Sequence, residues 1–248
     1  MHGIFRAFFQ WLSKVNEMVS CGHTNLKTKR GGFLMNVQSH LLNDTLRQQL
    51  ATVLKRMETK VTLVTIVDPH LEVSLELRDF VLDLANLGDQ LEAIVKMKGE
   101  DVSLEQKIRA DKFPVVALLD EKGRYSGVKF HAVPGGQEIN AFLLAIYNLA
   151  GPGQAIDERT LEAIRAIRQH VNLKVVVSLS SRLCPDVVVA ATRIAIENPN
   201  VEAEMIDLAH FPHLQAHYQI TAVPCLILND DHVYFGAKTM DQLLQLIS

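Results

Sequence analysis

The sequence contains few cysteines and no long hydrophobic run, and both shortages restrict what the chain can be. Only three of its 248 residues are cysteine, at Cys21, Cys184 and Cys225. An odd and low count argues against a disulfide-stabilised scaffold and for a reducing compartment, so we expect a cytoplasmic protein. No apolar run reaches the roughly 20 residues that a membrane helix needs, so we expect no membrane span.

The sequence also lacks a large excess of either charge. Its formal net charge is -3, its pI is near 6.4, and Lys27–Arg30 is its one short basic cluster. This balance excludes a strongly basic nucleic-acid surface. With 48% hydrophobic and 21% charged residues, the chain has an ordinary globular composition, sufficient for one large domain or two small ones.

Residues 1–40 do not share the regular pattern of the rest of the chain. The stretch IFRAFFQWLSKVNEMV is amphipathic, and no small-residue cleavage site follows it, so a secretory signal is not expected. A membrane-surface helix remains open because the stretch carries several bulky apolar side chains. We favour a leader over residues 1–34, with the natural start at Met35, and leave residues 1–40 outside the folded domains.

From Leu41 onwards, two segments repeat the same order of elements, which is α-β-α-β-α-β-β-α. Gly151-Pro152-Gly153 separates them, so we expect one domain over residues 41–150 and another over residues 151–248. Hydrophobic periodicity and β-branched runs predict the main helices and strands of both segments. In the first they fall at 41–58, 61–68, 73–88, 90–97, 113–130 and 139–150, and in the second at 156–170, 173–180, 185–198, 201–208, 211–220, 223–236 and 239–248.

The connections between these elements predict the fold class. Strands joined through helices favour parallel pairing, whereas the short turns at 121–123 and 229–231 favour antiparallel hairpins. Each hairpin follows a proline, Pro114 or Pro224. We therefore expect an α/β protein of two fused thioredoxin-like folds, each a mixed sheet flanked by helices.

The second segment contains the layout of a thiol redox site. In SLSSRLCPDVVVAATRIAIENP, a strand ends, a polar turn follows, and a cysteine and a proline begin a helix. Such sites usually carry two cysteines separated by two residues. Cys184 occupies the second position, but Ser181 occupies the first.

Several stretches resemble the N-terminal domain of the flavoprotein subunit of bacterial alkyl hydroperoxide reductase, a relative of the protein disulfide oxidoreductases. Together they cover nearly all of residues 41–248. The matching stretches are LRQQLATVLKRME, KFHAVPGGQEINAFLLAIYNLAG, SLSxxxxCPDVVVA, MIDLAHF, ITAVPCLILND and FGAKTM.

This resemblance implies a function in thiol–disulfide exchange and peroxide defence. In that family the domain passes electrons from a flavin and NAD(P)H-binding region to a peroxiredoxin, through a CxxC pair in its second half. The present chain departs from the pattern at Ser181 and in lacking the flavin and nucleotide domains. No GxGxxG follows a predicted strand, so we expect no bound FAD or NAD cofactor.

Cys184 is the main candidate for chemistry, and two interpretations of it remain open. A helix N-terminus favours a thiolate, and Arg182 would add to this effect. The second cysteine of such a pair is, however, usually shielded, and without its partner it is a small apolar core residue. Ser181 cannot replace a thiol without an adjacent base, and we interpret it as a helix N-cap.

The resemblance implies that Pro224 and Pro114 have cis peptide bonds, and that Pro224 lies beside the Cys184 loop. Cys225 would then lie near Cys184, which makes it a candidate partner thiol, although a core position on a strand is the favoured interpretation. Ser181, Arg182, Val223 and Pro224 are the candidate docking residues for a protein partner.

His210, His213 and His217 share one face of the predicted short helix and are weak candidates for a metal site. A solvated polar face is the favoured interpretation, and we expect no metal. In the first segment, Asp68–Leu71 occupies the loop where a redox pair would lie and contains no thiol, so we expect a structural first half.

Two functions remain. The chain exchanges thiols or electrons with a protein partner through Cys184, as at most a monothiol, glutaredoxin-like carrier. Alternatively, it is a redox-inactive docking or regulatory module. In both cases the expected partner is a peroxiredoxin or a separate flavin reductase, and the two-cysteine cycle is absent because the attacking sulfur is missing.

Overall fold

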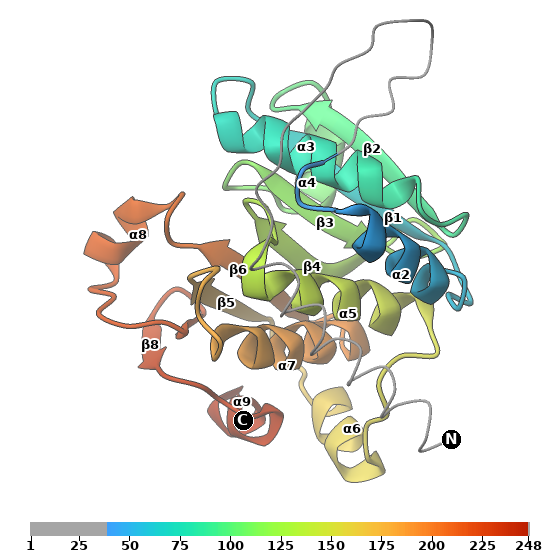
Figure 1. Cartoon of the computed structure of the whole chain (residues 1–248). Coiled ribbons are helices and arrows are strands. Elements are labelled where there is room, and N and C mark those ends of the chain that lie inside the picture. Colours follow the sequence, from blue (N-terminus) through green and yellow to red (C-terminus); the bar gives the residue numbers. More distant parts are fainter. Residues whose placement is uncertain (1–38, 248) are drawn as a thin grey trace, which may run out of the picture.

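A computed structural model describes residues 39–247 of the chain (Figure 1). The predicted leader, Met35 and Cys21 therefore lie outside the described residues, whereas Ser39 and His40 are described and contact Asp83 and Glu76. The elements of the first half are α2 (Asp44–Leu54), β1 (Val61–Val67), α3 (Glu72–Ala85), β2 (Leu91–Met97), α4 (Val102–Lys107), β3 (Val115–Leu119), β4 (Tyr125–His131), the 3-10 helix η1 (Gly136–Glu138) and α5 (Ile139–Ala150).

The second half repeats this order without the 3-10 helix. Its elements are α6 (Glu158–Arg165), β5 (Val171–Val177), α7 (Cys184–Glu197), β6 (Val201–Asp207), α8 (Pro212–His217), β7 (Cys225–Leu228), β8 (His232–Phe235) and α9 (Met240–Ile247). No helix within residues 39–247 is long and apolar enough to cross a bilayer.

The strands of both halves form one continuous eight-stranded sheet rather than two separate sheets. The strand order is β2-β1-β3-β4-β6-β5-β7-β8. Strands β4 and β6 pair in parallel across the junction, with Val128 opposite Ala203 and His131 opposite Ile206. The predicted mixed α/β sheet is confirmed, and the joining of the halves is a feature that the sequence pattern did not predict.

The two faces of the sheet are covered differently. On one face a single large apolar core runs across both halves, with α2, α3, α5, α6, α7 and α9 contributing side chains. Helices α5 and α7 lie side by side over the junction (Figure 1). The opposite face carries two smaller cores, one around Ile108 after α4 and one around Phe211 and Leu214 at α8.

The internal repeat is without insertions over its central part. Strands β1 and β5, strands β2 and β6, helices α4 and α8, and strands β3 and β7 all begin 110 residues apart. The same offset relates the predicted cis prolines, Pro114 and Pro224, which both have cis bonds in the structure. It also relates Arg109 and Gln219, two non-glycine residues with positive φ. Positions with equivalent roles can therefore be compared residue by residue.

Polar side chains cap two of the helices at their N-termini. The side chains of Asn43 and Asp157 accept hydrogen bonds from backbone N–H groups in the first turns of α2 and α6. Helix α3 ends with Asn86 in a right-handed conformation. Gly88, shortly after this helix, lies against α2, where an added Cβ would come within 2.8 Å of the Leu54 Cβ.

Candidate functional site: a degenerate thiol loop

The loop that follows β5 positions the candidate site. Strand β5 ends at Val177, and α7 begins at Cys184 with Pro185 in its first turn. A proline is suited to this position, because the first turn of a helix has no intrahelical partner for its N–H groups. The strand, polar loop and helix occur in the predicted order, although β5 ends at Val177, three residues before the predicted strand does, so the loop is longer than predicted.

Cys184 is buried in the large apolar core and has no exposed surface. Burial raises the pKa of its thiol above the usual range, and the carboxyl group of Glu138 raises it further. Hydrogen bonds from the Ser181 hydroxyl and the Ser178 backbone lower the pKa of the thiol, but by less than burial raises it. The thiol is therefore neither accessible nor held as a thiolate.

Ser181 is partly exposed and contacts Cys184 through its hydroxyl group. The expected N-cap role is wrong, because the residue preceding the first turn of α7 is Leu183, which makes no side-chain capping bond. Ser181 instead belongs to the tight loop, where its N–H donates to the Ser178 carbonyl.

The first half contains the same arrangement with a hydroxyl in place of the thiol. Ser74 lies 110 residues before Cys184 and is likewise fully buried. Its Oγ accepts a hydrogen bond of 3.0 Å from the N–H of Asp68, the residue equivalent to Ser178. The loop Asp68–Leu71 therefore closes on Ser74 as the second-half loop closes on Cys184. This equivalence supports a structural role for the sulfur.

Glu138 is a site residue that the sequence reasoning missed. It has no exposed surface, and neither carboxylate oxygen has a hydrogen-bond partner among the described residues. Burial, with smaller effects from Asp207 and Asp186, raises its pKa to about 8. Its charge influences Cys184 although it comes from the other half of the chain. The one sequence signal is a glutamate immediately before the almost wholly apolar helix INAFLLAIYNLA.

The η1 segment also holds the second-half loop in place. The N–H of Gln137 donates to the Leu179 carbonyl over 2.9 Å. Gly136 has φ +53°, and an added Cβ would come within 2.5 Å of that same carbonyl oxygen. Glycine is required here because only its backbone combines this conformation with so close an approach.

Of the predicted docking residues, Ser181 and Arg182 lie in this loop, whereas Val223 and Pro224 directly precede β7. Arg182 is exposed, and Leu183 is 59% exposed, the highest fraction among the large hydrophobic side chains of the described residues. Val223 is partly buried and packs against the large core, whereas Pro224 is buried. The backbone N–H and C=O of Val223 have no hydrogen-bond partner within residues 39–247.

The structure does not bring Cys225 together with Cys184. Both thiols are free and buried. Cys184 lies in the large core, whereas Cys225 points to the opposite face of the sheet and packs near Phe211 and Ile227. Burial raises the pKa of Cys225 to about 11. The geometry therefore supports the core interpretation of Cys225.

The three candidate metal-ligating histidines, His210, His213 and His217, do not share one helix face. Helix α8 begins at Pro212, so His210 lies in the preceding turn, with its Nε2 3.7 Å from Asp207. His213 and His217 contact the rings of Phe211 and Tyr218. The one group of potential metal ligands among the described residues is Asp111, His131 and Glu204, and both ring nitrogens of His131 already have partners there.

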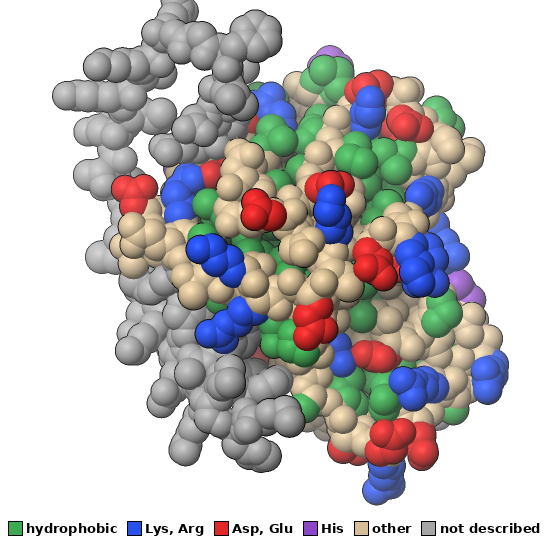
Figure 2. Space-filling view, turned by 90° about the vertical axis from the view of Figure 1, so that its right-hand side faces the viewer, with side chains coloured by type: hydrophobic (Ala, Val, Ile, Leu, Met, Phe, Trp, Pro, Cys, Tyr) green, Lys and Arg blue, Asp and Glu red, His purple; other side chains and the backbone are tan. Residues whose placement is uncertain are grey.

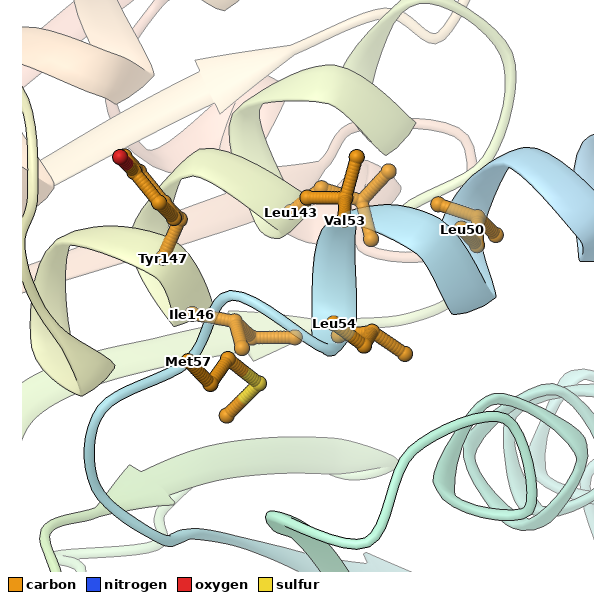
Figure 3. Close-up of a pocket in the computed structure, with 7 residues that line it drawn as sticks. All are labelled: Leu50, Val53, Leu54, Met57, Leu143, Ile146 and Tyr147. Carbon is orange, nitrogen blue, oxygen red and sulfur yellow. The ribbon is translucent and has the colours of Figure 1, made fainter.

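An apolar crevice between α2 and α5 is too small to be a ligand site. Its cavity volume is about 10 Å³, close to the minimum for one water molecule (Figure 3). The residues that line it are Leu50, Val53, Leu54, Met57, Leu143, Ile146 and Tyr147.

The fold and the loop together define a tandem thioredoxin-fold protein with an SxxC site in its second half. The thioredoxin domain family matches residues 171–248. A protein disulfide oxidoreductase from Aeropyrum pernix has the same fold, with a TM-score of 0.76 at 20% identity over 83% of this chain and 92% of that one.

Two solved structures from Enterococcus faecalis are more similar in sequence. A structure of a C503A mutant of AhpF, the F subunit of alkyl hydroperoxide reductase, has a TM-score of 0.81 and 35% identity, and covers 84% of this chain and 100% of its own. The NTD_N/C domain of AhpF has a TM-score of 0.79 and 35% identity, over 83% and 99% of the two chains. The present chain belongs to the family of the N-terminal domain of AhpF.

The curated relatives are longer proteins. AhpF of Staphylococcus aureus is 29% identical over 206 residues, which is 82% of this chain and 37% of the relative. A Pseudomonas putida protein of the same description is 29% identical over 204 residues. The present chain thus spans little more than a third of the length of these relatives.

Proposed function

We propose that this chain is a docking module of a thiol-based peroxide defence system, which binds a redox protein without running a two-cysteine cycle. The observation that carries the proposal is the pairing of a partly exposed Ser181 with a fully buried Cys184. Dithiol exchange begins with attack by an accessible thiolate. A hydroxyl at Ser181 cannot supply that attack without an adjacent base.

The surface of the second-half loop supports protein binding. Leu183 presents an exposed apolar side chain beside the cation of Arg182. The unpaired backbone N–H and C=O of Val223 offer main-chain hydrogen bonds to an extended segment of a partner. Apolar contact with main-chain pairing suits a peroxiredoxin or a separate flavin reductase, the two partner classes that the family suggests. The proposal places the protein in a reducing compartment such as the bacterial cytoplasm.

Binding to a purified two-cysteine peroxiredoxin and to a purified flavin-dependent disulfide reductase tests this proposal. We expect one of them to bind the wild-type chain, and Leu183→Asp to weaken that binding about tenfold or more. Cys184→Ser should leave it within about twofold, because the sulfur is buried. Val102→Asp, at an exposed hydrophobic residue of α4 in the first half, is the matched control. Failure of both proteins to bind, or loss of binding in Cys184→Ser, contradicts the proposal.

A second candidate function is a monothiol carrier that acts through Cys184. The contacts that favour it are those of the Ser181 hydroxyl and the Ser178 backbone with the sulfur, because both lower the pKa of the thiol. Alkylation of the native protein from pH 5 to 9, with peptide mass spectrometry, separates the two functions. If the chain is a docking module, Cys184 and Cys225 should react with the alkylating reagent only after denaturation. Rapid modification of native Cys184 identifies a carrier instead.

A further inference from the structure

Within residues 39–247, the two edge strands of the sheet differ in length. Strand β2 stands at one end of the strand order and β8 at the other (Figure 1). Strand β2 has seven residues, whereas β8 has four. An edge strand leaves a row of N–H and C=O groups outside the ladder, and proteins usually shorten or cover such a strand. The edge of β2 is therefore the longer open template for pairing with another chain.

Backbone groups in the middle of β2 point away from β1. At the end of the parallel ladder, the N–H of Lys98 donates to the Val67 carbonyl on β1. Because the direction of the backbone groups alternates along a strand, the even-numbered residues of β2 face β1 and the odd-numbered residues face outwards. The N–H and C=O groups of Ala93 and Val95 thus face outwards, and no described residue outside the ladder bonds to them.

The two ends of β2 are closed by the chain itself. The N–H of Leu91 donates to the Gly88 carbonyl. The N–H of Met97 donates to the Glu100 carboxylate over 2.9 Å, and its carbonyl accepts from the Glu100 N–H. A partner strand can therefore form hydrogen bonds mainly with the centre of β2.

The sequence of β2 is complementary to itself about Ile94. An antiparallel pairing with Ile94 of one copy opposite Ile94 of the other places Ala93 opposite Val95 on both sides of the centre. These become hydrogen-bonded pairs, which exchange bonds through the outward N–H and C=O groups. The same register places Glu92 of each copy opposite Lys96 of the other, at non-hydrogen-bonded positions where side chains lie closest.

Other antiparallel registers lose this match. A pairing centred on Ala93 or Val95 places Ile94 opposite a charged side chain. A pairing centred on Glu92 or Lys96 places like charges directly opposite each other, which is destabilising. The pattern of charges on β2 thus selects the register centred on Ile94.

The side chains at the centre of this register are accessible. Ile94 is 39% exposed and lies on the same face of the sheet as Val64, which belongs to the smaller core around Ile108. Pairing of two copies would cover Ile94 with its own counterpart and extend the apolar surface of that core. Burial of this apolar surface favours association.

The charged side chains of β2 are also able to meet a second partner. Glu92 is paired with Lys60 and Lys96 with Glu100, and all four side chains are at least 36% exposed. Exposed pairs of this kind are weak, so they do not hold the charges away from a neighbouring strand.

We infer that two copies of this chain dimerise through β2, in an antiparallel pairing centred on Ile94 that joins their sheets. The interface is isologous, since the same strand contributes to it from both copies. Its occupant is a second copy because the outward backbone groups and the charges of β2 match those of β2 itself. The docking loop follows β5 in the other half, so each dimer carries two docking loops. The inference does not depend on the proposed function.

Analytical ultracentrifugation of the full chain over about a hundredfold range of concentration tests the inference. We expect a monomer–dimer equilibrium that Val95→Pro weakens about tenfold or more, because proline removes an outward N–H while the ladder with β1 stays intact. Val233→Pro is the matched control on β8. Its N–H also points outwards, since Gly236 donates to Pro224 across the same hairpin. Dimerisation of this control should stay within about twofold of wild type.

Charge reversal tests the register. Glu92→Lys and Lys96→Glu each place like charges opposite each other in a homodimer, so each should weaken dimerisation about tenfold. An equimolar mixture of the two variants should restore it, because every charge then faces the opposite charge on the other copy. Sedimentation of the mixture and of each variant alone measures this difference.

Three outcomes overturn the inference. A wild-type chain that stays monomeric at the highest concentration shows that β2 does not pair with itself. Equal weakening by Val95→Pro and Val233→Pro, or no weakening by Val95→Pro, shows that any dimer uses another surface. A mixture of Glu92→Lys and Lys96→Glu that dimerises no better than either variant alone excludes the register centred on Ile94.

Discussion

At the scale of single residues, the comparison of the halves separates a structural sulfur from a reactive one. Ser74 and Cys184 occupy equivalent buried positions, and each receives a contact from the backbone six residues before it. Only one of the two positions carries a thiol, yet both loops have the same form. The position thus requires a small hydrogen-bond acceptor, which either residue provides.

This requirement predicts that two cysteine substitutions lower the free energy of unfolding by different amounts. Cys184→Ser should lower the free energy of unfolding by less than about 1 kcal/mol, because the new hydroxyl can accept from Ser178 as that of Ser74 does from Asp68. Cys225→Ser buries a hydroxyl with no partner in the described residues and should cost about 1–3 kcal/mol. Urea denaturation measures both, and a larger cost for Cys184→Ser contradicts the structural role.

Glu138 predicts a pH dependence of stability. Its pKa rises from the ordinary value of 4.5 to about 8 on folding. Between these values the folded state holds a proton that the unfolded state has lost. The stabilisation is therefore present below about pH 4.5 and is lost as the pH rises through about 8, at up to about 1.4 kcal/mol per pH unit.

Glu138→Gln isolates this effect, because the amide does not titrate. The difference in unfolding free energy between wild type and variant should move in favour of the variant as the pH rises from 5 to 9. Thermal denaturation at several pH values measures that difference. A constant difference across this range would show that Glu138 keeps an ordinary pKa.

At the scale of elements, the η1 segment of the first half supports the loop of the second. Gly136→Ala places a Cβ against the Leu179 carbonyl, whereas an added Cβ at Gly99 meets nothing within 4 Å. Both glycines have positive φ, at +53° and +83°, so the backbone strain is comparable. Gly136→Ala should cost about 1–3 kcal/mol more than Gly99→Ala, and NMR shifts should change at residues 178–183 only in the former.

Some features of the fold could be predicted from the sequence, and others could not. Strands such as β1 and β5 were predictable because they are rich in β-branched residues and are buried along almost their whole length. The pairing of β4 with β6 was not, because the repeat suggested two separate sheets and β4 carries the polar residues Lys129 and His131 on a buried face. Glu138 was missed for a related reason. Its position depends on contact between the halves, which no local pattern encodes.

At the scale of the whole molecule, buried charges on the face opposite the large core hold the halves together. Lys129 on β4 is 2% exposed, and its Nζ lies 2.6 Å from Glu202 and 3.7 Å from Glu204 on β6. Burial opposes ionisation of Glu204, but the His131 hydrogen bond and the nearby cations hold its pKa well below the usual range. These pairs lie between the two smaller cores, so the junction on this face is polar.

On the outer surface, unlike at the junction, the charged side chains are exposed. Basic and acidic side chains are intermixed over the face in Figure 2, with hydrophobic side chains between them. Exposed pairs of this kind contribute little to stability, because water and salt screen them. Lys60 and Glu92 form one such pair over 2.8 Å, with side chains 56% and 55% exposed. The chain thus offers a buried and an exposed lysine for direct comparison.

Lys129→Met and Lys60→Met make that comparison with the same chemical change. Lys129→Met leaves Glu202 buried beside Glu204 without its closest cation, and should cost about 3–5 kcal/mol of unfolding free energy. Lys60→Met should change the unfolding free energy far less, because water and salt screen the exposed pair with Glu92. Because Lys129 bridges the halves, its loss should also reduce the cooperativity of urea unfolding, so that fluorescence and circular dichroism transitions no longer coincide. Equal costs for the two variants would mean that packing of α5 against α7, rather than the buried charges, joins the halves.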